Sequence, residues 1–116
     1  MKIKLKRVYA PREKNDGRRI LVERLWPRGL TREAAGVDIW MKEVSPSPAL
    51  RQWFAHDPEK WPEFKRRYLA ELALIPEAVA ALRAQCADGA TFLFAAKDEE
   101  KNSAVLLKAF LDGKAR

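Results

Sequence analysis

Apolar and charged side chains alternate at the start of the chain, where residues 2–8 read KIKLKRV. On an extended backbone Ile3 and Leu5 face one side, and Lys4 and Lys6 face the other, which is the period of a half-exposed strand. Lysines along one side discourage pairing with the edge of another sheet. The pattern therefore predicts a strand at the edge of a sheet.

Two longer apolar runs predict strands that are covered on both faces. Residues 19–25 read RILVERL, and residues 90–96 read ATFLFAA. Runs of this length and composition are typical of strands buried inside a sheet. The run at 90–96 is unbroken and contains two phenylalanines, so it is the better candidate for the central strand. A shorter alternating segment, VDIWMKEV at residues 37–44, predicts a further strand.

Helical spacing and capping residues predict helices between these strands. The residues predicted to cap or open the five helices are Thr31, Ser47, Asp57, Pro76 and Asp98. Pro62 lies too far into the third helix for a cap at Asp57, because a proline inside a helix removes a hydrogen bond and clashes with the preceding turn. We therefore expect the first turn of that helix to break, or the helix to kink, at Pro62.

The strands and helices interleave along the chain, which predicts an α/β fold. The 116 residues match the size of one ordinary domain, and the 47% hydrophobic content is enough to bury a core. We therefore expect a single compact domain over residues 1–116, in which helices flank a small, mostly parallel sheet.

Charge is distributed unevenly along the chain. The formal net charge is +7, and residues 1–32 hold eleven Lys and Arg against three acidic residues. No stretch is long and apolar enough for a membrane span, and the N-terminus lacks the apolar block of a signal peptide. Cys86 is the single cysteine, which agrees with a reducing compartment. We expect a cytoplasmic protein that has no membrane partner, and nothing in the sequence sets its oligomeric state.

Charged and aromatic residues follow three of the predicted strands, at the positions where the strands end. They are Arg24, Trp26 and Arg28 after the second strand, Lys42 and Glu43 after the third, and Lys97 and Asp98 after the last. The carboxyl ends of parallel strands meet at one edge of a sheet, where α/β proteins bind ligands. Arginine offers a planar fork of donors and lysine a point charge, so the four cations suit a phosphate or a carboxylate.

This strand-end hypothesis makes a small anionic ligand, such as a nucleotide or a sugar phosphate, the expected partner. Catalysis by Glu43 or Asp98 would extend it. The alternative is structural: Arg24 pairs with Glu43 or Asp98, and Trp26 plugs the end of the sheet. The acidic residues 98–100 crowd the start of the last helix, where an anion would otherwise bind. Either the ligand lies nearer to Arg24 and Arg28, or Asp98 orients Lys97 or a substrate hydroxyl.

Other chemistry has less support. His56 is the only histidine, which excludes a multi-histidine metal site and leaves one imidazole for proton transfer. Cys86 lies on the apolar face of a predicted helix and is interpreted as a buried structural thiol. The chain has neither of the common glycine-rich phosphate loops, so no motif indicates ATP, a dinucleotide or another cofactor.

The basic N-terminal third supports a second hypothesis from a different class, a module that binds nucleic acid or an acidic protein. Such binding would depend on exposed cations and fall steeply with salt. The cations concerned are Lys2, Lys4, Lys6, Arg12, Arg18 and Arg19. Tyr9 is the one aromatic residue among them, which disfavours a platform for stacking single-stranded bases.

Five stretches of the chain carry a family resemblance. They are KRVYAP at 6–11, RILVERLWPRG at 19–29, DIWMKEVSPS at 38–47, LRQWFAHDPEKWPEFKRRYLAEL at 50–72 and AAKDEEKNSAVLLK at 95–108. By these motifs the chain resembles the YeaO-like branch of a bacterial family of domains of unknown function, number 488. The resemblance implies a small cytoplasmic α/β protein and supplies no reaction, substrate or cofactor. Family members often carry histidine where this chain has Asn102 or Ser103, so it implies no histidine-dependent role there.

Overall fold

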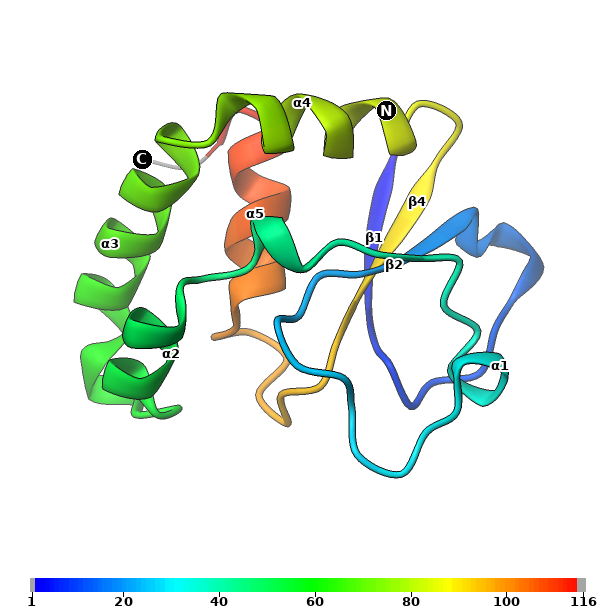
Figure 1. Cartoon of the computed structure of the whole chain (residues 1–116), viewed down its shortest axis with the longest axis horizontal. Coiled ribbons are helices and arrows are strands. Elements are labelled where there is room, and N and C mark those ends of the chain that lie inside the picture. The colour runs from blue at the N-terminus through cyan, green and yellow to red at the C-terminus, as the bar shows by residue number, and fades with distance from the viewer. Residues whose placement is uncertain (1, 115–116) are drawn as a thin grey trace.

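The computed structural model describes residues 2–114 of the chain. The strands are β1 (Ile3–Arg7), β2 (Arg18–Leu21), β3 (Ile39–Trp40) and β4 (Ala90–Phe94). The α-helices are α1 (Arg32–Ala35), α2 (Pro48–Phe54), α3 (Trp61–Ala73), α4 (Pro76–Gln85) and α5 (Ser103–Leu111). Short 3₁₀ turns cover Lys14–Asp16, Lys42–Val44 and Pro58–Lys60. Strands and helices together form the α/β domain that the sequence predicts (Figure 1).

The four strands form one sheet in the order β1-β4-β2-β3, and every neighbouring pair is parallel. Phe92 on β4 lies opposite Leu5 on β1 and Ile20 on β2. The predictions of an edge strand at the N-terminus and a central strand near residue 92 are therefore confirmed. The predicted mostly parallel sheet is wholly parallel over these strands.

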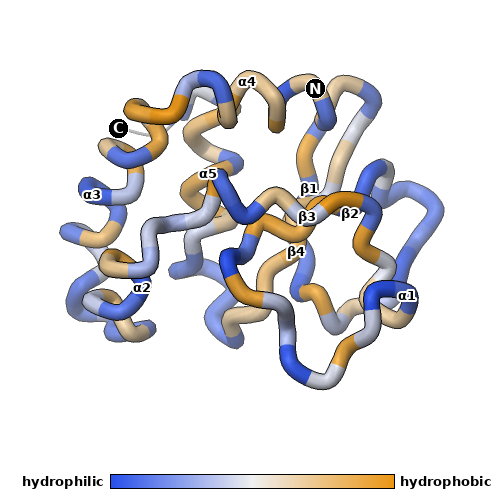
Figure 2. The backbone as a smooth tube through the Cα atoms, viewed as in Figure 1, coloured by the Kyte–Doolittle hydropathy of each residue, from blue (hydrophilic) through white to orange (hydrophobic). Residues whose placement is uncertain are grey.

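Alternation along the strands divides the core into two layers. Ile20 and Phe92 point toward the larger cluster, which α2 to α5 cover on one face of the sheet. Leu21 and Leu93 point toward a smaller cluster on the other face, beside α1. Figure 2 shows hydrophobic segments along the central strands and hydrophilic segments on the outer loops. Both layers follow from the period of two along buried strands.

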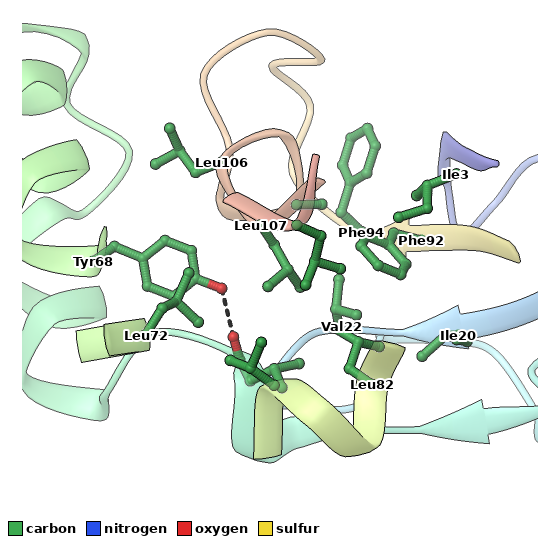
Figure 3. Packing of buried hydrophobic residues seen from close by; sticks show 14 of the residues in the cluster. Ile3, Ile20, Val22, Tyr68, Leu72, Leu82, Phe92, Phe94, Leu106 and Leu107 are labelled. Carbon is green, nitrogen blue, oxygen red and sulfur yellow. Dashed lines mark hydrogen bonds between the residues drawn. The ribbon is translucent and has the colours of Figure 1, made fainter. Parts of the chain in front are cut away.

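Tyr68 ties α3 to the segment that follows β3. The side chain is buried, and its hydroxyl donates a hydrogen bond to the main-chain carbonyl of Val44 (Figure 3). In the same view Leu72, one turn further along α3, lies beside Tyr68, and Val22 lies beside Leu82 of α4. A buried carbonyl needs a donor, and the tyrosine supplies one without breaking the apolar layer.

Several element boundaries differ from those that the sequence predicts. The second strand ends at Leu21 instead of Leu25, and the third covers two residues because a 3₁₀ turn begins at Lys42. The cap predicted at Asp98 is wrong. The last helix begins at Ser103, where the side chain of Asn102 accepts from the N–H of Val105. Asp98 instead caps the preceding turn.

The first turn of the third predicted helix breaks, as expected. Asp57 caps the 3₁₀ turn that Pro58 opens, accepting from the N–H of Glu59 at 3.0 Å. The α-helix proper begins at Trp61, which places Pro62 in its first turn. A proline is tolerated there because the N–H groups of the first turn have no partner within the helix. Over residues 2–114, no helix is long and apolar enough to cross a membrane.

Candidate functional site

A pocket of about 800 Å³ lies at the carboxyl ends of β2 and β4. Most of its lining comes from four segments: the loop after β2, the end of α2, the loop after β4 and the start of α5. The core aromatic rings of Phe54 and Phe64 form part of its wall and stack with their centroids 4.2 Å apart. The location is the edge of the sheet where parallel α/β folds bind ligands.

The structure brings together five of the eight residues named from the sequence. Those that line the pocket are Trp26, Arg28, His56, Lys97 and Asp98. Those outside its lining are Arg24, Lys42 and Glu43. Two of the three strand-end segments therefore converge on the pocket, and the segment after β3 does not.

Arg24 uses its guanidinium within the fold. Nε donates to the carbonyl of Pro46 at 3.2 Å, and Nη2 donates to the carbonyl of Ser45 at 3.3 Å. These bonds tie the end of β2 to the segment before α2. The structural alternative expects the Arg24 guanidinium to pair with Glu43 or Asp98. Its hydrogen-bond partners are instead main-chain carbonyls.

Lys42 and Glu43 lie in the 3₁₀ turn after β3, and both side chains are exposed. The ammonium of Lys42 lies 5.1 Å from the centre of the Trp40 ring, a cation–π distance. Neither residue is part of the pocket lining. The sequence pattern predicts them at the end of the third strand, but that strand already ends at Trp40.

Trp26 forms a fixed wall of the pocket. Its indole Nε1 donates to the carbonyl of Leu30 at 2.7 Å, and its ring meets the ring of Trp40 edge to face at 5.4 Å. Tyr9 donates from its hydroxyl to the carbonyl of Arg28 at 3.3 Å, which ties the loop to the end of β1. The exposed side chain of Arg28 lies at the mouth of the pocket.

Sequence reasoning missed Glu23 as a pocket residue. Its Oε1 accepts from the N–H of Ala95 at 3.0 Å, and its main-chain carbonyl accepts from the indole of Trp40 at 2.7 Å. The carboxylate thus binds an N–H just beyond the last paired residues of β2 and β4, Leu21 and Leu93. The signal was present as the one acidic residue inside the apolar run RILVERL.

Burial raises the pKa of Glu23, since a low-dielectric environment disfavours the charged form. The N–H of Ala95 and the nearby side chains of Arg51 and His56 act in the opposite direction and lower the pKa. Arg51 also lines the pocket and was likewise missed, because it lies inside α2 and not at a strand end.

The backbone at the end of α2 adopts an unusual conformation beside the pocket. Ala55 has φ of 46° and His56 has φ of 58°, and both lie in the left-handed region. Two consecutive residues other than glycine rarely occupy this region, and such strain gathers at ligand sites. It places the exposed His56 on the pocket wall, with its ring 6.1 Å from that of Phe54.

Asp98 is held as a turn cap. Its Oδ1 accepts from the N–H groups of Lys101 and Glu100, both at 2.9 Å, and these bonds lower the pKa of Asp98. Asn102 closes the same turn by donating from Nδ2 to the Asp98 carbonyl at 2.9 Å. Among residues 2–114 there is no group of three or more side chains suited to hold a metal ion.

Several cations of the basic N-terminal third bind acidic residues of the same chain. Lys6 and Arg19 both contact Asp16, with N to O distances of 2.9 and 2.8 Å. Arg12 contacts Asp38 at 2.8 Å. The expectation that Arg19 is exposed is wrong, because the whole residue is 1% exposed. Internal pairing leaves fewer free charges for a nucleic acid, which makes that hypothesis the weaker one.

The comparisons with known proteins assign a family. The model described as "Inactive DUF488-N3 subclade" matches residues 2–116. The uncharacterized protein YeaO of Escherichia coli is 41% identical over 116 residues, 96% of this chain and 97% of YeaO. The uncharacterized protein Rv3073c of Mycobacterium tuberculosis is 44% identical over 71 residues. That match spans 61% of this chain and 60% of the mycobacterial protein, less than two thirds of its length. No solved structure matches the chain.

Proposed function

Because the chain belongs to the DUF488-N3i family, the inactive N3 subclade, we propose that it binds a ligand without turning it over. The proposed ligand is a small molecule that carries a phosphate or a carboxylate, and the proposed site is the pocket at the carboxyl ends of β2 and β4. The observation that carries the proposal is a set of three unpaired cations around one pocket.

The three cations are Arg28, Arg51 and Lys97, and each comes from a different segment of the chain. Within residues 2–114, none of them lies within 4.0 Å of a carboxylate oxygen. Cations elsewhere in the chain, such as Lys6 and Arg19, form ion pairs with Asp16. Unpaired charges gathered on one cleft raise the local concentration of an anion.

The rest of the wall suits the body of an organic ligand. Trp26, Phe54 and Phe64 present apolar surface, and small-molecule sites combine such surface with a few polar groups. The lining also holds two carboxylates, Glu23 and Asp98, so the three cations leave an excess of positive charge, and two main-chain N–H groups fix the Asp98 carboxylate in the turn after β4. Arg24 and Lys42, which lie outside the pocket, are left out of the proposal, whereas Trp26, Arg28 and Lys97 are kept.

Titration calorimetry with methyl phosphate tests the proposal. We expect saturable binding to the wild type, and about tenfold weaker binding to Arg51→Ala, since a charge-assisted hydrogen bond contributes about 1.4 kcal/mol or more. Arg28→Ala and Lys97→Ala should weaken binding by smaller factors, because these exposed side chains are screened by solvent.

Arg24→Ala is the matched control. It removes the same kind of side chain, but one at the end of β2 that is not part of the pocket lining and whose guanidinium bonds the carbonyls of Ser45 and Pro46. We expect it to lower stability and to leave the affinity for methyl phosphate unchanged. Absence of saturable binding to the folded wild type would overturn the proposal, and so would an equal loss of affinity in Arg24→Ala and Arg51→Ala.

A further inference from the structure

Glu23 has one carboxylate oxygen that the fold does not use. Oε1 accepts the N–H of Ala95, and no donor among residues 2–114 bonds to Oε2. In that part of the chain every fully buried polar side-chain atom has a hydrogen-bond partner, so Oε2 is reached from solvent. Since Glu23 lines the pocket, the pocket is where that solvent access lies.

The surroundings of Glu23 determine which kind of group Oε2 can bind. A carboxylate only accepts hydrogen bonds, so its partner must carry a donor. Arg51 and His56 already act on Glu23 electrostatically and line the same pocket. A second full positive charge would lie near the Arg51 guanidinium and be repelled, whereas a neutral O–H or N–H would not.

We propose that Glu23 is the specificity-determining residue of the pocket and that Oε2 accepts a hydrogen bond from a neutral O–H or N–H group of the ligand. This inference rests on the proposed function. It makes the ligand class an anion that also carries a neutral donor, such as a sugar phosphate or a nucleoside monophosphate. The anionic group lies at the cations and the donor lies at Glu23.

The affinity of a ligand should depend on whether it donates a hydrogen bond to Oε2 of Glu23. A ligand without the donor would take water from Oε2 and leave a partly buried carboxylate without a partner, and such mismatches are costly. A bare anion therefore binds the cations but gains nothing at Glu23. Glu23 also repels any anion to some extent, and a donor on the ligand offsets that repulsion.

The test compares ligands that share a phosphate and differ in the donor: methyl phosphate with none, glycerol phosphate with hydroxyls, guanosine monophosphate with ribose hydroxyls and base N–H groups, and phosphoethanolamine with an ammonium. For the wild type we expect glycerol phosphate or guanosine monophosphate to bind about tenfold tighter than methyl phosphate. Preference for glycerol phosphate assigns the donor to O–H, and preference confined to guanosine monophosphate assigns it to the nucleoside, through a ribose O–H or a base N–H. Either result supports the proposal.

Glu23→Gln provides the decisive arm, because glutamine keeps the shape and an acceptor for the Ala95 N–H but loses the charge. The preference over methyl phosphate should disappear, while the affinity for methyl phosphate is kept or raised. Glu43→Gln is the matched control, since Glu43 is an exposed glutamate outside the pocket, and it should keep the preference. If Glu23→Gln does not fold, Glu23→Asp serves as the second variant. It keeps the charge, but its shorter side chain moves the carboxylate oxygen away from the ligand, so the preference over methyl phosphate should be reduced.

Equal wild-type affinities for methyl phosphate and the neutral-donor ligands would overturn this inference and leave the proposed function standing. A preference that survives in Glu23→Gln would also overturn it. Tighter binding of phosphoethanolamine than of both neutral-donor ligands would overturn the assignment of a neutral donor. Failure of every phosphate to bind the wild type would instead refute the proposed function itself.

Discussion

Replacing Asp16 with asparagine should destabilise the fold more than any exchange at an exposed ion pair. The Asp16 carboxylate is fully buried and accepts from Lys6 Nζ at 2.9 Å and Arg19 Nη1 at 2.8 Å. It also accepts from the N–H of Glu13 at 3.0 Å. Asparagine keeps the volume of the side chain but leaves the buried guanidinium of Arg19 without a counter-charge.

The loss can be given a magnitude. The Arg19 guanidinium also donates to three main-chain carbonyls, those of Ala10, Ala35 and Gly36, so its hydrogen bonds are largely kept and its charge is not. Breaking a buried pair by removing one partner costs about 3–5 kcal/mol. A domain of this size is stable by about 5–15 kcal/mol, so a large share of the stability would be lost. With a urea m-value of about 1–3 kcal/mol/M, the unfolding midpoint should fall by about 1 M or more.

Urea unfolding followed by circular dichroism measures this shift, with Arg66→Ala as the control. Arg66 pairs with Glu63 on the exposed side of α3, and its removal should leave the midpoint nearly unchanged. Burial alone would raise the pKa of Asp16, but the hydrogen bonds from Glu13, Lys6 and Arg19 lower it well below the ordinary value.

The stabilisation from Asp16 is therefore present above the ordinary aspartate pKa and is lost as the pH falls toward the folded-state value. The difference between the wild type and Asp16→Asn should shrink accordingly in strong acid. A variant within about 1 kcal/mol of the wild type at neutral pH, no more than an exposed pair contributes, would refute the reasoning.

Three further predictions concern single positions. Burial raises the pKa of Glu23, so the wild type should lose stability as the pH rises above the ordinary glutamate pKa. Glu23→Gln should remove this loss, which urea midpoints across mildly acidic and neutral pH measure. An unchanged pH dependence in the variant would contradict the prediction. Gly17→Ala should cost about 1–3 kcal/mol more than Gly29→Ala. Both glycines have positive φ, but a Cβ at Gly17 would lie 2.6 Å from a main-chain oxygen and one at Gly29 meets nothing within 4 Å; equal melting temperatures would argue against a close approach. Tyr68→Phe should cost about 1–3 kcal/mol in urea unfolding, since the buried Val44 carbonyl loses its donor; a neutral exchange would show that water replaces it.

Much of the fold was readable from the sequence because it depends on local rules. The alternation at residues 2–8 and the apolar run at residues 90–96 predicted an edge strand and a central strand, and both are confirmed. Capping also followed local chemistry at Ser47, which accepts from the N–H of Leu50 at the start of α2. The cap at Asp98 was mispredicted because two aspartate-type caps lie four residues apart, and only packing decides which one begins the helix.

The candidate site was readable only in outline. A parallel α/β sheet gathers its strand ends at one edge, so a pocket near Arg28 and Lys97 could be expected from the strand order alone. The arginine at position 24 could not be told from the one at position 28 by type or spacing. The structure separates them, because the carbonyls of Ser45 and Pro46 lie within reach of only one of the two.

The sequence by itself determined the class of fold. The hydrophobic periodicity of strands and helices, and the residues that cap the helices, depend only on a few neighbouring positions. Only the tertiary structure decided which charges are free. Asp16 and Arg19 neutralise each other inside the protein, whereas Arg51 lines an open pocket from a helix in which the sequence indicated no functional residue. Glu23, the one acidic residue of the apolar run at residues 19–25, likewise lines this pocket and accepts the N–H of Ala95. The physical reason is that the energy of a charge depends on the groups within a few ångströms of it, and those groups come from distant parts of the chain.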